Sequence, residues 1–432
     1  MKVTVIGTGY LGATHAAAMA EIGHDVLGID IDADKVARLN QGHVPFFEPG
    51  LPELLQRHVV SGRLRFTTSF AEVGDFGDVH FVCVGTPQRA GENAADLRYV
   101  DAAIEALVGV ARPGSIVVGK STVPAGTAVK AATRVESVGA ELVWNPEFLR
   151  EGFAVQDTLH PDRIVMGVSA DRAEKVMREV YEPIIAAGTP VIVTDFATAE
   201  LVKVAANAFL ATKISFINAM AEVCEATGAD VTELAHALSY DERIGGKFLH
   251  AGLGFGGGCL PKDIRAFIAR AEELGVDQAV MFLKEIDAIN LRRRARMVDL
   301  ARELCDGSLA GVRVGVLGAA FKPNSDDIRD SPALDVAVAI QRAGAAVRVY
   351  DPEAMSNARR DFPTLAYAES AVDACRDADI VLHLTEWAEF RTMAPERLGA
   401  VVRHRKIVDG RNALDAERWR AEGWLYRALG RQ

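Results

Sequence analysis

The stretch VTVIGTGYLG, residues 3–12, joins a short β-branched, apolar run to three glycines spaced G-x-G-x-x-G. An Ala-rich segment at 13–22 is helical in composition, and DVLGID then reads as a second strand ending at Asp30. Together they predict a dinucleotide-binding α/β unit, in which the backbone approaches a pyrophosphate at a helix N-terminus. Asp30 would bind a ribose 2′-hydroxyl and repel a 2′-phosphate, which favours NAD over NADP. A glycine turn selected only for packing is the alternative.

The alternation of strands and helices continues beyond this unit and returns near the C-terminus. The expected strands are VHFVCVG (79–85), SIVVGKST (115–122), ELVWNP (141–146), GVRVGVLG (311–318), AVRVYDP (346–352), DIVLHLT (379–385) and KIVDG (406–410). A helix is expected at 331–344, with Ser331 as its N-cap and Pro332 in its first position. The predicted fold class is α/β, with two Rossmann-like doubly wound parallel-sheet domains.

The middle of the chain is expected to be helical. From Phe196 to Thr227 it has neither Gly nor Pro, which permits a helix of about 48 Å at about 1.5 Å per residue. Further helices are expected around 229–239, 263–274 and 277–304. The predicted domains are a dinucleotide-binding Rossmann domain at 1–195, a central helical domain at 196–305, and a second Rossmann-like domain at 306–432.

Composition narrows the class of protein. The chain has 432 residues, 49% apolar and 25% charged, with a net charge of −11, which argues against nonspecific binding to nucleic acid or acidic membranes. No uninterrupted apolar run approaches the roughly 20 residues of a membrane span, and no signal peptide is recognised. Five scattered cysteines without CxxC spacing, and histidines without ligand spacing, predict no disulfide framework and no metal site. We therefore expect a cytoplasmic protein.

The stretch FGGGCLPKD, residues 255–263, places one thiol between three glycines and a charged pair. A nicotinamide enzyme that carries an alcohol to the acid level needs a nucleophile, because an aldehyde donates hydride readily only after an addition to its carbon. The glycines would admit a substrate, while a following helix N-terminus and Lys262 would lower the pKa of the Cys259 thiol. The alternative is a buried cysteine that packs a loop. That interpretation is preferred for the other four, Cys83, Cys224, Cys305 and Cys375.

Two further pairs have helical spacing. Lys203 and Asn207 are i, i+4 on the long helix and could stabilise an oxyanion, although a solvated lysine beside a polar Asn fits the spacing equally well. Glu147 and Glu151 are also i, i+4, after an expected Asn145 cap. They are either partners of the helix dipole or, near a thioester, a base for water.

Two other residues lie near the expected cofactor site. Thr122 follows a strand end, where α/β sheets bind ligands, and Lys35 lies near the expected ribose. A solvated helix lysine is the alternative for Lys35.

Taken together, these motifs resemble the nucleotide-sugar 6-dehydrogenases, the UDP-glucose/GDP-mannose dehydrogenase family. The matching stretches are VIGTGYLG, FFEPGL, VCVGTP, STVPAGT, NPEFLREG, HPDRIVMG, ELVKVAANAFLATKISFINAMAEVCE, RIGGKFLHAGLGFGGGCLPKD, AFKPNSDDIRDSPA and VYDP, with a weaker match in DGRN at 409–412. The resemblance implies two NAD⁺-dependent oxidations of a sugar C6 alcohol to a carboxylate, consuming one water. It also places the chain in nucleotide-sugar metabolism, supplying UDP-glucuronate for polysaccharide biosynthesis.

The resemblance assigns roles by position. Cys259 is the nucleophile, Lys203, Asn207 and Asp263 surround C6 and a water, Thr122 orders that water, and Glu147 is the base for thioester hydrolysis. The implied cofactor residues are Gly7, Gly9, Tyr10, Leu11, Gly12, Asp30, Lys35, Thr86, Thr122, Glu151, Lys262 and Arg329. The implied substrate residues are Glu147, Phe148, Leu149, Arg150, Glu151, Lys203, Asn207, Arg243, His250, Phe255, Gly256, Cys259, Phe321, Lys322 and Arg411, the last reaching in from a neighbouring subunit.

The stretches RIVMG and RIGGKFL favour the branch that acts on UDP-glucose over those acting on GDP-mannose or UDP-N-acetylhexosamines. His250 stands where relatives often have Lys, which would weaken a contact there or make it sensitive to pH. A two-electron hydroxyacid dehydrogenase would not need Cys259, and a non-catalytic NAD-binding protein would not need the Lys-Asn and Glu pairs. The resemblance and the apolar stripe of the long helix predict a homodimer, with higher oligomers left open.

Overall fold

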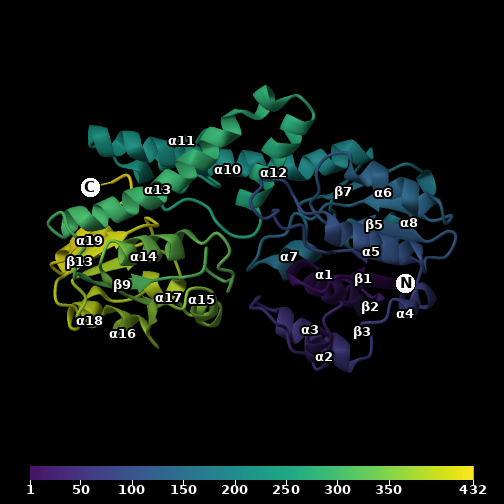
Figure 1. The fold of residues 1–432 in the computed structure, drawn as a ribbon, viewed down its shortest axis with the longest axis horizontal. Coiled ribbons are helices and arrows are strands. Elements are labelled where there is room, and N and C mark those ends of the chain that lie inside the picture. The colour runs from purple at the N-terminus through teal and green to yellow at the C-terminus, as the bar shows by residue number, and fades with distance from the viewer. Residues whose placement is uncertain (432) are drawn as a thin grey trace. The chain divides into compact units, whose positions relative to one another are not determined.

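The computed structural model describes residues 1–431 of the chain. These residues form two compact units, Met1–Ala206 with Arg265–Gly275, and Asn207–Ile264 with the chain from Val276 onward. Each unit contains one sheet of mostly parallel strands with helices packed against it (Figure 1). The predicted fold class, two Rossmann-like domains with a long helix between them in sequence, is confirmed.

The first unit is built on a sheet with the order β3-β2-β1-β4-β5-β6-β7-β8, parallel except between β6 and β7. Its strands are β1 (Lys2–Ile6), β2 (Asp25–Ile29), β3 (Leu64–Thr67), β4 (Val79–Val82), β5 (Ile116–Gly119), β6 (Glu141–Trp144), β7 (Ile164–Val168) and β8 (Val191–Thr194). Its helices are α1 (Tyr10–Glu21), α2 (Ala33–Asn40), α3 (Leu51–Val60), α4 (Ala71–Phe76), α5 (Arg98–Val108), α6 (Thr127–Glu136), α7 (Ala154–Leu159), α8 (Asp171–Val180) and α9 (Glu182–Ala186). The chain winds outward in both directions from β1 and β4, so their carboxyl ends form the switch point at which such sheets bind ligands.

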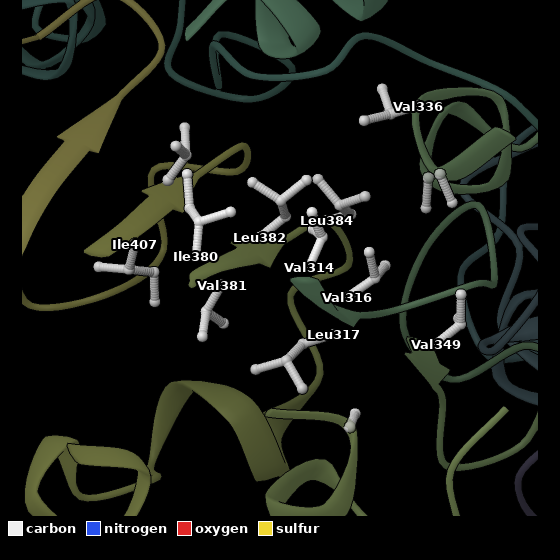
Figure 2. Packing of buried hydrophobic residues seen from close by; sticks show 14 of the residues in the cluster. Val314, Val316, Leu317, Val336, Val349, Ile380, Val381, Leu382, Leu384 and Ile407 are labelled. Atoms are coloured by element: carbon white, nitrogen blue, oxygen red, sulfur yellow. The ribbon is translucent and has the colours of Figure 1, made fainter. Parts of the chain in front are cut away.

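The second unit is built on a fully parallel sheet with the order β11-β10-β9-β12-β13-β14. Its strands are β9 (Arg313–Leu317), β10 (Ala346–Tyr350), β11 (Ala366–Tyr367), β12 (Ile380–His383), β13 (Lys406–Asp409) and β14 (Leu425–Ala428). Its helices are α11 (Val231–Ser239), the 3₁₀ helix η1 (Asp277–Val280), α13 (Phe282–Leu304), α14 (Pro332–Arg342), α15 (Met355–Asp361), α16 (Ala371–Cys375), α17 (Ala388–Arg391), α18 (Pro395–Gly399) and α19 (Ala416–Ala421). Figure 2 shows Ile380 and Leu382 pointing to one face of the sheet and Val381 to the other, as the period of a strand buried on both sides requires.

Two helices, α10 (Phe196–Thr227) and α12 (Leu260–Glu273), each contribute residues to both units. The bounds of α10 are those expected from the absence of Gly and Pro. Among residues 1–431, α10 alone is long and apolar enough to cross a membrane, a test that core helices also pass. Two of its buried polar side chains have hydrogen-bond partners: Ser215 donates to the Ile286 carbonyl at 2.8 Å, and the Asn218 amide oxygen accepts from the Gly252 N–H at 2.9 Å. Such partners are typical of a helix packed within a protein.

Most expected elements are present, with shifted ends. Ser331 caps α14, because its hydroxyl accepts from the Leu334 N–H, and Pro332 occupies the first position. The helix expected from Pro146 to Glu151 was wrong: residues 145–150 are irregular and the next helix, α7, begins at Ala154. Asn145 does not cap a helix, because its amide donates to the Val165 carbonyl at 2.8 Å and its oxygen accepts from Lys120 and Tyr181.

Candidate active site

The three glycines of the first turn have three different physical roles. Gly7 has φ of +85°, a conformation that side chains with a Cβ rarely adopt. A Cβ on Gly12 would lie 1.8 Å from the Gly7 carbonyl oxygen, so the fold itself requires glycine there. A Cβ on Gly9 would meet nothing within 4 Å, so the fold leaves open space beside the first turn of α1. That turn has no side-chain cap and no acidic residue, which fits a pyrophosphate on its N–H groups.

The carboxylate expected to bind the ribose is held in one orientation. The Asp30 Oδ2 atom accepts from the Thr8 N–H at 2.9 Å, the Thr8 hydroxyl at 2.9 Å and Lys35 Nζ at 3.0 Å. Burial acts to raise the pKa of Asp30, but the hydrogen bonds from Lys35 and the backbone outweigh it and lower the pKa. Asp30 is therefore an ionised acceptor at the carboxyl end of β2, and Lys35 lies next to it, where the sequence placed it.

Thr86 and Thr122, both expected near the cofactor, are brought together. The Thr86 hydroxyl donates to the Thr122 carbonyl at 2.8 Å. Ser121, the residue before Thr122, donates to the Val84 carbonyl at 2.7 Å. These bonds join the loops that follow β4 and β5, so both threonines lie at the carboxyl edge of the sheet, on the same edge as Gly7 and Asp30.

The segment carrying Glu147 is irregular but tightly bonded. Glu147 Oε1 accepts from the N–H groups of Phe148 and Leu149 at 2.8 and 3.0 Å, and Oε2 lies 3.0 Å from Lys120 Nζ. Further along, the carboxylate of Glu48, in FFEPGL, accepts from the Gly152 and Ala154 N–H groups, both at 2.7 Å. Two carboxylates thus shape the segment, and one of them is a candidate base.

The other expected residues of this segment lie in different surroundings. The Phe148 ring lies 4.0 Å from the Arg163 guanidinium and 5.4 Å from Lys203 Nζ, measured to the ring centroid. Leu149 is half-buried and Glu151 is buried. Arg150 is exposed, and its guanidinium pairs with Asp157 through two bonds of 2.7 and 2.8 Å.

The loop before Cys259 is rigid, because its backbone is bonded almost residue by residue. The Leu253 N–H donates to the Gly410 carbonyl at 2.8 Å, and the Gly257 N–H donates to the Arg329 carbonyl at 2.8 Å. Between them, the side chain of Asn290 on α13 binds both the N–H and the carbonyl of Phe255, at 2.7 and 2.9 Å.

The glycines of this loop are required by close packing. A Cβ on Gly256 would lie 2.2 Å from the Asp330 carbonyl oxygen, and one on Gly257 would lie 2.7 Å from the Phe321 ring.

Cys259 is exposed and immediately precedes α12, whose first intrahelical bond, from the Asp263 N–H, goes to the Cys259 carbonyl. The helix start expected after the thiol is thus present. By contrast, burial raises the pKa of Cys83 and of Cys375 to about 12. In residues 1–431 the exposed thiol is the one that the loop pattern singled out.

The first turn of α12 also carries a buried polar cluster. The Asn207 amide of α10 donates to Asp263 Oδ2 at 2.7 Å, and Lys262 Nζ lies 2.5 Å from Asp263 Oδ1. Asp263 is buried one helical turn beyond Cys259. The structure therefore joins two of the expected catalytic residues, Asn207 and Asp263, directly, and places the nucleophile candidate beside them in sequence.

The residues expected around the nucleotide-sugar lie in several settings. Arg243 and His250 are exposed. The Arg243 guanidinium donates two hydrogen bonds to the Asp241 carboxylate, at 2.6 and 3.0 Å. Lys322 Nζ lies 5.4 Å from the centroid of the Phe321 ring, and the Arg329 guanidinium bonds to Asp327.

Arg411, expected to reach in from a neighbouring subunit, is half-buried and bonds to three backbone carbonyls of its own chain. It donates to the carbonyls of Leu384, Gly254 and Phe321 at 2.8, 3.0 and 3.1 Å. Its guanidinium therefore ties the loop before Cys259 to the loop that carries Phe321 and Lys322.

Sequence reasoning missed the residues that form hydrogen bonds or ion pairs with the candidate site residues or with the backbone of their loops. These are Glu48, Lys120, Asn145, Tyr181, Asn290 and Arg411 in its tying role. A lysine directly after a buried strand, as in VVGKS, was a usable signal, because a cation at a strand end must have a partner. Within residues 1–431 no group of three or more His, Cys, Asp or Glu side chains could hold a metal ion.

A glycine turn with room beside it, a fixed carboxylate at the end of β2 and an exposed thiol at a helix start define a dinucleotide-dependent α/β oxidoreductase. Comparisons with known proteins identify its family. Residues 1–185, 197–292 and 315–416 match, in turn, the NAD binding domain, the central domain and the UDP binding domain of the UDP-glucose/GDP-mannose dehydrogenase family. The chain belongs to this family and is an NAD-dependent oxidoreductase.

Individual relatives match over the full length. The chain is 43% identical to a UDP-glucose 6-dehydrogenase of Rhizobium meliloti, with 100% of each chain covered. It is 42% identical to the UDP-glucose 6-dehydrogenase AglM of Haloferax volcanii, covering 99% of this chain and 100% of the relative. Among solved structures, a UDP-glucose dehydrogenase from Pyrobaculum islandicum matches with a TM-score of 0.91 and 38% identity, covering 100% of this chain and 98% of that one. A UDP-D-ManNAc dehydrogenase from Pyrococcus horikoshii matches with a TM-score of 0.86 and 27% identity, covering 100% of this chain and 99% of that one.

Proposed function

We propose that this enzyme oxidises the C6 alcohol of UDP-glucose to the carboxylate of UDP-glucuronate. The reaction consumes two NAD⁺ and one water and yields two NADH and three protons. The observation that carries the proposal is the exposed Cys259 thiol at the start of α12, on a loop held rigid by its backbone bonds. An enzyme that stopped at the carbonyl would have no use for it, because addition of a thiolate is what prepares an aldehyde for a second oxidation.

We propose that the second oxidation proceeds through two covalent intermediates on Cys259. The Cys259 thiolate adds to the aldehyde carbon and the carbonyl oxygen takes up a proton, giving a thiohemiacetal. Loss of that proton and of a hydride leaves a thioester; water then adds to its carbon, the C–S bond breaks and Cys259 is released as a thiolate. NAD⁺, held at the glycine turn and Asp30, would supply the hydride acceptor for both the alcohol and the thiohemiacetal, one molecule for each oxidation.

We propose that polar groups on α10 and α12 act at C6. Lys203 and Asn207 stabilise the oxyanion that forms when sulfur or water adds, as donors aimed at developing charge do in general. Asp263, whose Oδ2 accepts from Asn207, relays the proton of the alcohol. Thr122 orders the attacking water, and Glu147 accepts its proton during hydrolysis.

We propose that the cofactor binds to the turn of Gly7, Gly9 and Gly12, with its ribose on Asp30 and Lys35. The support is local: the open space at Gly9 and the fixed ionised carboxylate of Asp30. The remaining cofactor contacts are assigned to Tyr10, Leu11, Thr86, Thr122, Glu151, Lys262 and Arg329.

We propose that the substrate meets two sets of residues. The sugar is assigned to residues 147–151, Lys203 and Asn207. The nucleotide is assigned to Arg243, His250, Phe255, Gly256, Phe321 and Lys322. Arg411 supports the nucleotide loop through the Phe321 carbonyl. The alternative substrates are UDP-N-acetylhexosamines and GDP-mannose, on which the same chemistry would operate.

The test measures how many NADH form per sugar consumed, with four nucleotide sugars compared in parallel. These are UDP-glucose, UDP-N-acetylglucosamine, UDP-N-acetylmannosamine and GDP-mannose. We expect two NADH per UDP-glucose consumed and little turnover of the others. One NADH per sugar would replace the proposal with a two-electron oxidation. Cys259→Ser should nearly abolish acid formation, while Cys305→Ser, a half-buried thiol on a different loop, should not. Unchanged turnover of Cys259→Ser would exclude the covalent route.

We propose three domains, 1–195, 196–305 and 306–432, and a homodimer formed through α10. The outward face of α10 exposes Phe209, Phe216 and Val223 by 66, 46 and 52%, at seven-residue spacing, which is more apolar surface than a monomer usually leaves. Light scattering of the wild type and of Phe216→Glu tests this, and a monomeric wild type would refute it. A cytoplasmic location is proposed because the sequence holds five scattered cysteines without CxxC spacing, which suits a reducing compartment.

A further inference from the structure

A fully buried lysine lies behind the candidate base for hydrolysis. Lys120 directly follows β5, and Asn145 directly follows β6. The register of the sheet pairs Gly119 with Trp144, so the next residues of both strands emerge side by side at the carboxyl edge. Glu147 is two residues beyond Asn145. The sheet thus brings a cation, an amide and a carboxylate together, although Lys120 and Glu147 lie far apart in sequence.

The Lys120 ammonium group has three polar contacts within this cluster. Lys120 Nζ lies 3.0 Å from Glu147 Oε2, 3.1 Å from Asn145 Oδ1 and 3.4 Å from the Tyr181 hydroxyl, which itself donates to Asn145 Oδ1 at 2.7 Å. Burial acts to lower the pKa of Lys120, but the Glu147 carboxylate outweighs it and raises the pKa. Lys120 is therefore a charged group that cannot reach solvent.

The other titratable groups around Lys120 carry no charge near neutral pH. They come from α1, from β4 and from the end of α8. Burial lowers the pKa of His15 well below its usual value and raises the pKa values of Cys83 and Tyr181 to about 12. Lys203 and Arg163 face the ring of Phe148 rather than Lys120. Glu147 therefore forms its ion pair with Lys120.

We propose that Lys120, held by Asn145 and Tyr181, is a positioning residue that orients Glu147 for hydrolysis of the Cys259 thioester. This inference rests on the proposed function. With Oε2 on Lys120 and Oε1 on the Phe148 and Leu149 N–H groups, the carboxylate is fixed at both oxygens before substrate arrives. Water gives its proton to Glu147 while its oxygen bonds to the thioester carbon. Lys120 thereby holds the carboxylate in one orientation toward the water.

The test is Lys120→Met in the full-length enzyme with NAD⁺ and UDP-glucose. Both hydride transfers precede hydrolysis, so we expect a rapid burst of two NADH per site, followed by a steady state about tenfold slower or more. Intact mass spectrometry of quenched samples should find the acyl group on Cys259. Lys130→Met, an exposed lysine on α6, is the matched control and should behave as wild type.

A Glu147→Gln variant separates the inference from the function on which it rests. If Glu147→Gln fails to accumulate thioester, Glu147 is not the base, and both that assignment and this inference are wrong. If Glu147→Gln accumulates thioester but Lys120→Met hydrolyses at the wild-type rate and leaves no acyl group on Cys259, the inference alone is overturned.

A double variant covers the case in which Lys120→Met does not fold, as judged by loss of NADH binding. Lys120→Met with Glu147→Gln removes both charges together. It should hydrolyse as slowly as Glu147→Gln alone, because the lysine acts only through that carboxylate. A further slowing in the double variant would overturn the inference.

Discussion

The loop that carries Cys259 depends on one buried side chain, and Asn290→Ala removes it. Asn290 is fully buried on α13, and its amide forms two hydrogen bonds with the backbone of Phe255, four residues before Cys259. The substitution leaves the Phe255 N–H without its partner. The Phe255 carbonyl keeps one donor, the Arg294 guanidinium at 3.3 Å.

The expected loss of stability follows from these contacts. A buried N–H left unsatisfied costs about 1–3 kcal/mol, and the lost bond to the carbonyl costs about 1 kcal/mol, which gives roughly 2–4 kcal/mol in total. For a unit of roughly 200 residues, each kcal/mol lowers Tm by about 2–4 °C. We therefore expect the unfolding transition of the second unit to fall by about 4–16 °C. We also expect a loss of kcat of about tenfold or more, because the loop no longer holds the thiol in position.

Intrinsic fluorescence during thermal and urea unfolding measures this effect. Three of the four tryptophans, Trp387, Trp419 and Trp424, lie in the second unit, so the signal reports mainly on it. Asp299→Ala on the same helix removes only an exposed ion pair and should change stability by less than about 0.5 kcal/mol. A transition of Asn290→Ala within 2 °C of wild type, with unchanged kcat, would refute the assignment of Asn290 as the support of this loop.

Other perturbations separate fold from function in the first unit. Gly9→Ala should leave the melting curve unchanged but weaken NADH binding, measured by fluorescence titration, because its Cβ enters open space that the pyrophosphate would occupy. Gly12→Ala should destabilise the unit by about 3 kcal/mol or more, since its Cβ meets the Gly7 carbonyl; equal behaviour of the two variants would refute the distinction. Burial lowers the pKa of His80 to about 4, so the unfolded chain takes up a proton first as pH falls from 6.5 to 4. That group alone should remove about 3 kcal/mol of stability across this window, and His80→Gln should flatten the urea midpoint against pH; an unchanged slope would contradict it.

How far the sequence could predict the site is clearest from Asn145 and Glu147. The sequence named Glu147 as a candidate base on the first turn of a helix, but the helix predicted from its spacing to Glu151 is absent. The segment is irregular because Asn145 is bonded to Val165 and Tyr181 on other elements. Local spacing carries no information about those partners, which lie 20 and 36 residues further along the chain.

The sequence by itself determined the features whose free energy is local. Gly7, Asp30, the Ser331 cap and the uninterrupted span of α10 depend on φ preference, capping and the absence of helix breakers, and these act within about one turn of chain. Tertiary structure alone decided what surrounds the candidate groups: Lys120 beside Glu147, Asn290 beside Phe255, and the Gly254 and Phe321 carbonyls beside Arg411. These arrangements arise because sheet order and register bring distant residues together, and a buried charge or N–H is stable only when the fold supplies its partner.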